Sequence, residues 1–147
     1  MKTDLILAPT QIRDILKIAD ARFGLVSLMP DMGESSADIL KYIEGEACWM
    51  ITTSSDDYST LYSYVLLDWC AEREAQIHFT RFNQFNIKEG WKQVLKITDE
   101  YIDIIHAYIN TERRDVIKLA EALGFTFTIK EGIYHGQNSK KSRELIN

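Results

Sequence analysis

Short apolar runs and regular spacings predict a strand and a helix at the start of the chain. Residues 5–7 are apolar and indicate a strand, which Pro9 should end. A helix is expected next, with Thr10 as its N-cap, because Thr side chains accept hydrogen bonds from the first turn. The apolar face of this helix repeats at helical spacing and comprises Ile12, Ile15, Leu16 and Ala19.

Turn-forming residues separate this helix from a second one. Residues 27–34 include Pro30 and Gly33, and they predict a loop. Ser35 stands three residues before an acidic residue, in the arrangement of a capping box, and indicates the start of the second helix. Gly45 should end it, since glycine adopts the backbone conformation of a helix C-terminus readily.

The pattern then changes to three successive strands, at residues 48–53, 60–67 and 75–82. Residues 54–57 and 71–73 have the polar composition of turns. In the third strand Ala75, Ile77 and Phe79 alternate with polar residues, which indicates a strand with two different faces.

Helices and strands alternate in the second half. Helical spacing predicts helices at residues 87–101 and 111–123, and apolar runs predict strands at 104–109 and 125–129. In the second of these helices Val116, Ile117, Leu119, Ala120 and Leu123 should pack on the sheet. Residues 136–139, with the sequence Gly-Gln-Asn-Ser, predict a hairpin turn before a last strand.

This order of elements predicts an α/β fold of the α+β kind, with a mixed twisted sheet of about seven strands flanked by about four helices. A strand-helix-strand crossover implies parallel pairing in the middle of the sheet, whereas a meander of three strands is antiparallel. The length of 147 residues fits one domain, which we expect to span residues 1–147.

Composition narrows the functional classes. Hydrophobic residues at 46% and charged residues at 27% are typical of a globular chain. The net charge of −5 argues against nucleic-acid binding, which needs clustered cations. The basic cluster Lys140, Lys141 and Arg143 is interpreted as a solvated end of the chain. No apolar run approaches the 18 or so residues of a membrane span.

Both cysteines, Cys48 and Cys70, lie in or beside apolar runs, and we expect two buried thiols that act as small hydrophobic residues. The first residues lack the apolar stretch and small-residue cleavage site of a signal peptide. The expected location is therefore the cytoplasm.

Residues 109–125 read INTERRDVIKLAEALGF, a strand followed by an amphipathic helix that ends in Leu-Gly-Phe. With the element order, this stretch resembles the Gcn5-related N-acetyltransferase (GNAT) superfamily over nearly the whole chain. A narrower resemblance, to phage-encoded GNAT-like proteins that include head-assembly proteins, rests on residues 75–79, 113–120 and 132–133. It implies location in a host cytoplasm or a virion.

The resemblance implies acetyl-CoA as cofactor, with its pyrophosphate on a loop of the pattern R/Q-x-x-G-x-G/A. If Gly90 is the last position of that pattern, Phe85 replaces the Arg or Gln and Lys88 replaces the first Gly. A tolerated helix glycine at position 90 and a core role for Phe85 are the alternatives. The cofactor-binding residues that the resemblance implies are Thr80, Phe82, Phe85, Asn86, Lys88, Gly90, Asn110 and Arg113.

Two catalytic positions of the family are also altered. The general-acid tyrosine falls at Ala120, and the asparagine of the same helix falls at Arg113. His78 is the first candidate for a substitute base, Glu74 is the second, and Tyr134 or Tyr108 could supply a proton. Each could instead be a half-buried sheet residue. The sequence shows no Cys/His cluster with metal-ligand spacing.

Three functions follow as hypotheses, and the third of them is an adaptor or inhibitor whose acidic surface binds a basic partner. The first is an acetyl-CoA-dependent N-acetyltransferase that acts on an unknown amine and is weakly active or inactive. The second is a non-catalytic module on the same fold that binds a protein partner or assembles a phage particle. A homo-oligomer is one assembly consistent with either.

Overall fold

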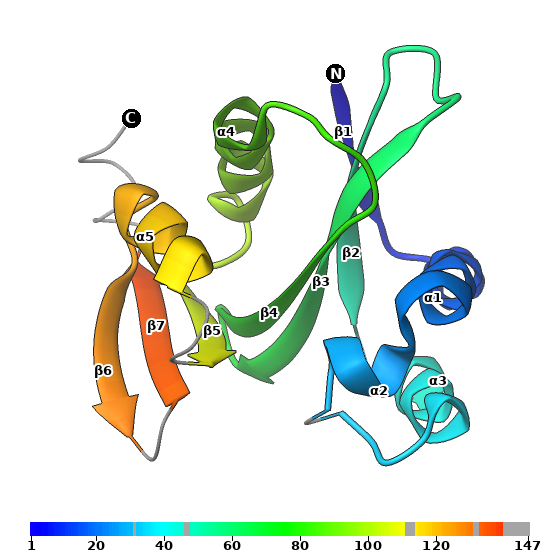
Figure 1. The fold of residues 1–147 in the computed structure, drawn as a ribbon, viewed down its shortest axis with the longest axis horizontal. Coiled ribbons are helices and arrows are strands. Elements are labelled where there is room, and N and C mark those ends of the chain that lie inside the picture. The colour runs from blue at the N-terminus through cyan, green and yellow to red at the C-terminus, as the bar shows by residue number, and fades with distance from the viewer. Residues whose placement is uncertain (31, 46–47, 111–113, 131–132, 140–147) are drawn as a thin grey trace. The chain divides into compact units, whose positions relative to one another are not determined.

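The computed structural model describes residues 1–30, 32–45, 48–110, 114–130 and 133–139 (Figure 1). Seven strands and five helices lie in these ranges. The strands are β1 (Lys2–Ile6), β2 (Trp49–Ser54), β3 (Leu61–Ala71), β4 (Glu74–Arg81), β5 (Ile104–Asn110), β6 (Thr126–Lys130) and β7 (Ile133–Ser139). The helices are α1 (Pro9–Phe23), α2 (Leu25–Leu28), α3 (Ser36–Gly45), α4 (Ile87–Thr98) and α5 (Arg114–Ala122).

The strands form one mixed sheet in the order β1-β2-β3-β4-β5-β7-β6. β2 is antiparallel to β1 and β3, and β7 is antiparallel to β5 and β6. β4 and β5 are parallel neighbours joined by α4, as a crossover unit requires. The predicted mixed α+β fold is therefore confirmed.

The chain divides into two compact units. The first comprises residues 1–68 and 78–85, and the second comprises residues 69–77 and 86–147. The boundary crosses β3 and β4, so each of these strands contributes to both units. A single domain over residues 1–147 stays a prediction.

The core of the first unit lies between its three helices and one face of β2 and β3. Ile12 and Leu16 of α1, Ile39 of α3, and Met50 and Tyr64 of the sheet are fully buried in one hydrophobic cluster. Alternate strand residues enter this cluster because successive side chains of a strand point to opposite faces.

In the first unit one local expectation was wrong, and another was correct except for its first two residues. Helix α1 begins at Pro9, with Ala8 and not Thr10 as N-cap, because the fixed φ of proline suits the first helical position. The loop predicted at residues 27–34 begins at Met29, because the short helix α2, whose Leu25 is fully buried, continues to Leu28. Ser35 does cap α3 as predicted, since its Oγ accepts a hydrogen bond from the Asp38 N–H at 3.1 Å.

The inward face of β4 changes along the strand. Ala75 and Ile77 are buried, whereas Phe79 is 41% exposed and Thr80 is buried. Alternation places Thr80 on the face opposite Ala75 and Ile77, so the two faces of β4 are buried along different parts of the strand.

Helix α5 packs with the face that its periodicity predicts. Ile117, Ala120 and Leu123 are buried, while Lys118 and Glu121 are exposed. Gly124 follows with a φ of 98°, a conformation that glycine adopts without steric cost. The Phe125 N–H then donates to the carbonyl of Ala120, which closes the C-terminus of the helix.

The hairpin predicted at residues 136–139 is wrong, because these residues belong to β7. Gly136 lies opposite Phe127 of β6, and a Cβ at position 136 would lie 2.5 Å from the ring of Phe127. Asn138 is fully buried and its side-chain amide donates to the carbonyl of Leu123 at 2.9 Å. Gly136 and Asn138 are residue types that are common in turns, but in this strand Gly136 allows close packing and Asn138 forms a buried hydrogen bond.

Within the described residues, no helix is long and apolar enough to cross a membrane.

Candidate functional site

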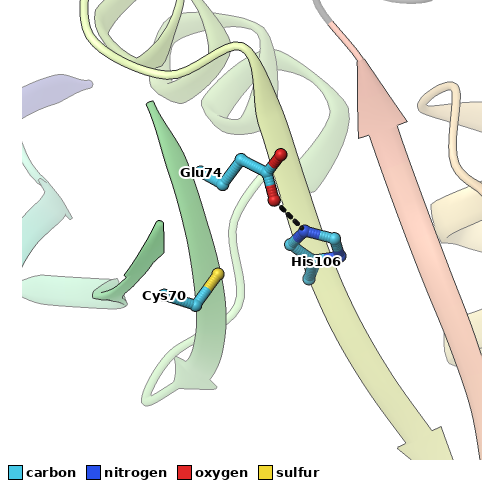
Figure 2. Close-up of side chains that lie close together, drawn as sticks. All are labelled: Cys70, Glu74 and His106. Carbon is cyan, nitrogen blue, oxygen red and sulfur yellow. Dashed lines mark hydrogen bonds and ion pairs between the residues drawn. The ribbon is translucent and has the colours of Figure 1, made fainter. Parts of the chain in front are cut away.

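Three polar side chains of the second unit form a continuous hydrogen-bonded chain. Glu74 begins β4, His106 lies on β5 and His135 lies on β7. The Glu74 Oε2 is 3.0 Å from the His106 Nε2, and Figure 2 shows the two side chains turned toward each other. The other ring nitrogen of His106, Nδ1, is 2.9 Å from the His135 Nε2.

Strand pairing brings these residues together. β5 pairs with β4 on one side, through Glu74↔Ile104 to Gln76↔His106, and with β7 on the other. His106 therefore lies between the two neighbouring strands. It is well shielded, since its side chain is 13% exposed, whereas the Glu74 side chain is 34% exposed.

Hydrogen-bonding rules assign the protons along this chain. An ionised carboxylate only accepts, so the His106 Nε2 donates to Glu74. In a neutral His106 the Nδ1 then accepts, and the His135 Nε2–H donates to it. The Nδ1 of His135 is left as the basic atom at the end of the chain. A proton taken up there can pass through both imidazoles to the carboxylate.

Tyr108 extends the group by stacking on His135, with ring centroids 4.6 Å apart and planes at 6°. Tyr108 is itself 54% exposed. Burial lowers the pKa of His135 because it disfavours the charged ring, and the neighbouring His106 lowers it further by charge repulsion. The neutral, proton-accepting form of His135 is thereby favoured near neutral pH.

A tight turn places Glu74 beside β5. Glu72 and Arg73 connect β3 to β4, and Arg73 has a φ of 58°, which side-chain-bearing residues rarely adopt. Arg73 also binds Asp103: its carbonyl accepts the Asp103 N–H at 2.7 Å, and its guanidinium holds the carboxylate at 3.0 and 3.1 Å. The turn is thus tied to the residue that precedes β5.

Cys70 stands on the other side of this turn, near the end of β3. It is exposed, so the expectation of two buried thiols holds for Cys48 only. Apolar neighbours in sequence do not bury a residue at the end of a strand. The ligand atoms of Cys70, Glu74 and His106 all lie within 4.8 Å of one another, and Figure 2 shows the thiol and the carboxylate on neighbouring strands.

The start of α4 is the position that the resemblance assigns to a pyrophosphate. Asn86 is the N-cap of this helix, and its Oδ1 accepts a hydrogen bond from the Glu89 N–H at 3.2 Å. Lys88 is exposed and Gly90 is buried within the helix. One of the backbone donors at this helix N-terminus is therefore occupied by the side chain of Asn86.

The loop before α4, in the first unit, is closed by its own side chains. Arg81 contacts Gln84 through a hydrogen bond, donates to the Asn83 carbonyl at 3.3 Å and lies over the ring of Phe85. Phe85 also stacks on Tyr62, with centroids 5.5 Å apart. An open cavity beside this loop is lined by Arg22, Arg81, Phe82, Asn83 and Gln84.

The remaining sequence-predicted residues are dispersed. His78 is half-buried on β4, and Thr80 and Phe82 are buried, Phe82 in the core of the first unit. Arg113 and the side chains of Asn110 and Tyr134 lie outside the described residues. Sequence reasoning selected Glu74 but missed its partners. The available signal was that His106 and His135 lie in two segments with strand character, yet their pairing register could not be read from the sequence.

Comparison with known proteins identifies the fold. No protein-family model matches the chain, and no curated protein matches its sequence. Among solved structures, a variant of the spermidine N-acetyltransferase SpeG from Vibrio cholerae is similar over 97% of each chain, at a TM-score of 0.65 and 13% identity. An uncharacterized protein from Bacillus halodurans is similar over 98% of this chain and 87% of its own, at a TM-score of 0.67 and 11% identity.

A domain from Methanocaldococcus jannaschii is similar over 94% of this chain and 98% of its own, with a TM-score of 0.66 and 15% identity. At such low identities these structural similarities show a shared fold and nothing more. The fold of this chain is that of the GNAT acetyltransferases, in agreement with the resemblance seen in the sequence.

Proposed function

We propose that this chain is a GNAT-fold protein that binds acetyl-CoA weakly and transfers acetyl groups to an amine slowly or not at all. The fold supports a relationship to N-acetyltransferases. The observation that carries the proposal is the start of α4, where Asn86 caps the helix with its own side chain.

A helix N-terminus binds a pyrophosphate through backbone N–H groups that point at the phosphate oxygens. In this chain the Glu89 N–H already donates to Asn86. Lys88 occupies the position of the first glycine in the family's pattern. Its Cβ restricts the approach of the backbone to a phosphate, which a glycine would allow. The Lys88 ammonium supplies a positive charge near the start of the helix. We therefore expect the pyrophosphate to bind weakly and not to be excluded altogether.

The family's proton donor is also missing. Ala120, at the position of the general-acid tyrosine, is a buried residue whose methyl group faces the core of its unit. A positioned general acid typically contributes about 10²–10⁴-fold to a rate. A thiolate leaving group must then depart without protonation by this residue, which supports slow transfer.

A general base for the acceptor amine is proposed at the hydrogen-bonded chain of Glu74, His106 and His135. Bound acetyl-CoA supplies a thioester for attack by an amine. The chain of Glu74, His106 and His135 can accept a proton from an amine at the His135 Nδ1 and deliver it to the carboxylate. This arrangement replaces His78 as the first candidate for the base.

Calorimetry with acetyl-CoA, followed by an assay of CoA release over a panel of polyamines and peptides, tests the proposal. We expect a dissociation constant well above the micromolar range and at most slow turnover. The double variant Phe85→Arg/Lys88→Gly restores the family's pattern and should bind acetyl-CoA at least about tenfold more tightly, a gain of about 1.4 kcal/mol.

Lys92→Gly is the matched control, because it removes an exposed lysine of the same helix without restoring the pattern. Micromolar binding with robust turnover by the unmodified chain would overturn the proposal. If neither the unmodified chain nor the double variant binds at millimolar acetyl-CoA, the non-catalytic module, with a protein partner or a role in phage assembly, becomes the better hypothesis.

A further inference from the structure

We propose that Cys70, Glu74 and His106 form a binding site for a divalent transition-metal ion of the zinc class. The three side chains come from the end of β3, the start of β4 and the middle of β5 (Figure 2). All three belong to the second unit, and their ligand atoms lie within 4.8 Å of one another. Glu74 and His106 also belong to the proposed proton chain, so a bound ion would replace the hydrogen bond between them, but the metal site does not require acetyl-CoA to bind.

The donor set selects the kind of ion. A thiolate, an imidazole nitrogen and a carboxylate oxygen are the ligands that Zn²⁺ uses, whereas Mg²⁺ and Ca²⁺ prefer oxygen alone. Three protein ligands with a fourth position left to water is the arrangement of zinc sites that react with other molecules. The exposure of Cys70 and the partial exposure of Glu74 give an ion a path from solvent.

The distances need little adjustment. In a tetrahedral site with metal–nitrogen and metal–oxygen bonds of about 2.1 Å, two such ligand atoms lie about 3.4 Å apart. The Glu74 Oε2 and the His106 Nε2 are already 3.0 Å apart. The Cys70 sulfur, within 4.8 Å of both, has to approach by about 1 Å, which a side chain at the exposed end of a strand can do by rotation.

The surroundings of His106 are those of a metal ligand. Ligating histidines typically use their second ring nitrogen in a hydrogen bond that orients the ring. Here the His106 Nδ1 is bonded to the His135 Nε2 at 2.9 Å, which leaves the Nε2 directed at Glu74 and available to an ion. When a metal takes the Nε2, the proton of the neutral ring resides on Nδ1 and His106 donates to His135.

Co²⁺ added to the full reduced chain, under anaerobic conditions and with a phosphine reductant, reports the ligands directly. We expect a thiolate-to-cobalt charge-transfer band at one equivalent, with visible d–d bands of the intensity typical of four-coordination. Calorimetry with Zn²⁺ should give one ion per chain. Cys70→Ser should abolish the charge-transfer band, and His106→Gln should weaken Zn²⁺ binding more than about hundredfold.

The controls separate this site from simple thiol chemistry. Cys48→Ser and Glu72→Gln, which change the other thiol and an exposed carboxylate of the adjacent turn, should leave both readouts unchanged. His135→Gln should weaken binding by about 10–100-fold while keeping the charge-transfer band. Circular dichroism of every variant establishes that it is folded.

Absence of the charge-transfer band in the unmodified chain, its persistence in Cys70→Ser, or Zn²⁺ affinity unchanged in His106→Gln would each overturn the proposal. None of these readouts involves acetyl-CoA, so a failure here and a failure of the proposed function are distinguishable.

Discussion

The contact between Gly136 and Phe127 can be tested by adding one methyl group. These residues lie opposite each other on β7 and β6, and the ring of Phe127 occupies the space that a side chain at position 136 would need. A Cβ placed there would lie 2.5 Å from one ring carbon and 3.0 Å from two others. Real Cβ atoms do not approach so closely, so the ring or the strand has to move.

The expected cost follows from two opposing effects. Overpacking of a well-filled region costs about 1–3 kcal/mol. Replacing a strand glycine by alanine reduces the entropy of the unfolded chain and returns about 0.5–1 kcal/mol, provided the backbone conformation suits alanine. The φ of Gly136 is not among the positive values that would strain an alanine. Gly136→Ala should therefore lower the free energy of unfolding by about 1–2 kcal/mol.

Chemical denaturation of a double-mutant cycle is the assay. Phe127→Leu removes the ring atoms that lie closest, so Gly136→Ala should cost at least about 1 kcal/mol less in the Phe127→Leu background than alone. Gln137→Ala, at the neighbouring exposed position of β7, is the control for strand propensity. An unchanged or raised stability of Gly136→Ala, or an equal cost in both backgrounds, would refute the close contact.

Three further predictions concern burial. Ile117→Ala, on the packed face of α5, should lower the free energy of unfolding by about 2–5 kcal/mol in a denaturant titration. The control Lys118→Ala, on the exposed face, should lower it by less than about 0.5 kcal/mol, and equal costs would mean that the assigned face is wrong. Asn138→Ala should cost about 1–3 kcal/mol, because it removes the donor to a buried carbonyl, and amide exchange at the end of α5 should quicken with it; a neutral effect would contradict that role. Burial raises the pKa of Tyr64 to about 12, so the unfolded chain ionises first and stability falls as the pH rises from 10 towards 12. Between pH 9 and pH 11 the free energy of unfolding of Tyr64→Phe, measured by denaturant titration, should fall by about 1 kcal/mol less than that of the unmodified chain. Equal decreases in the two proteins would refute this explanation.

Local chemistry determined much of the fold. The repeat of Ile12, Leu16 and Ala19 indicated α1, and the repeat of Ile117, Ala120 and Leu123 indicated the buried face of α5. These predictions succeeded because a helix has one periodicity, and burying its apolar stripe is the main source of its stability. The crossover between β4 and β5 followed as well, since a strand-helix-strand unit leaves few topologies.

The predictions that failed depended on contacts between distant residues. Gly136 and Asn138 suggested a turn because glycine and asparagine serve turns and close packing equally well, and only the partner strand distinguishes the two. Cys70 was expected to be buried because its sequence neighbours are apolar, but it lies near the end of β3 and is exposed, and only the fold determines which part of a strand the core covers.

The candidate site was decided almost wholly by tertiary structure. The sequence offered Glu74 as one carboxylate among many acidic residues, and it offered His106 and His135 as single histidines 29 positions apart. Their hydrogen-bonded chain exists because β5 lies between β4 and β7 in one particular register. A shift of one residue in either pairing would turn one of these side chains to the opposite face of the sheet. Local propensity sets which segments become strands, but the pairing of strands distant in sequence depends on the packing of the whole unit, and that pairing brings these polar side chains together.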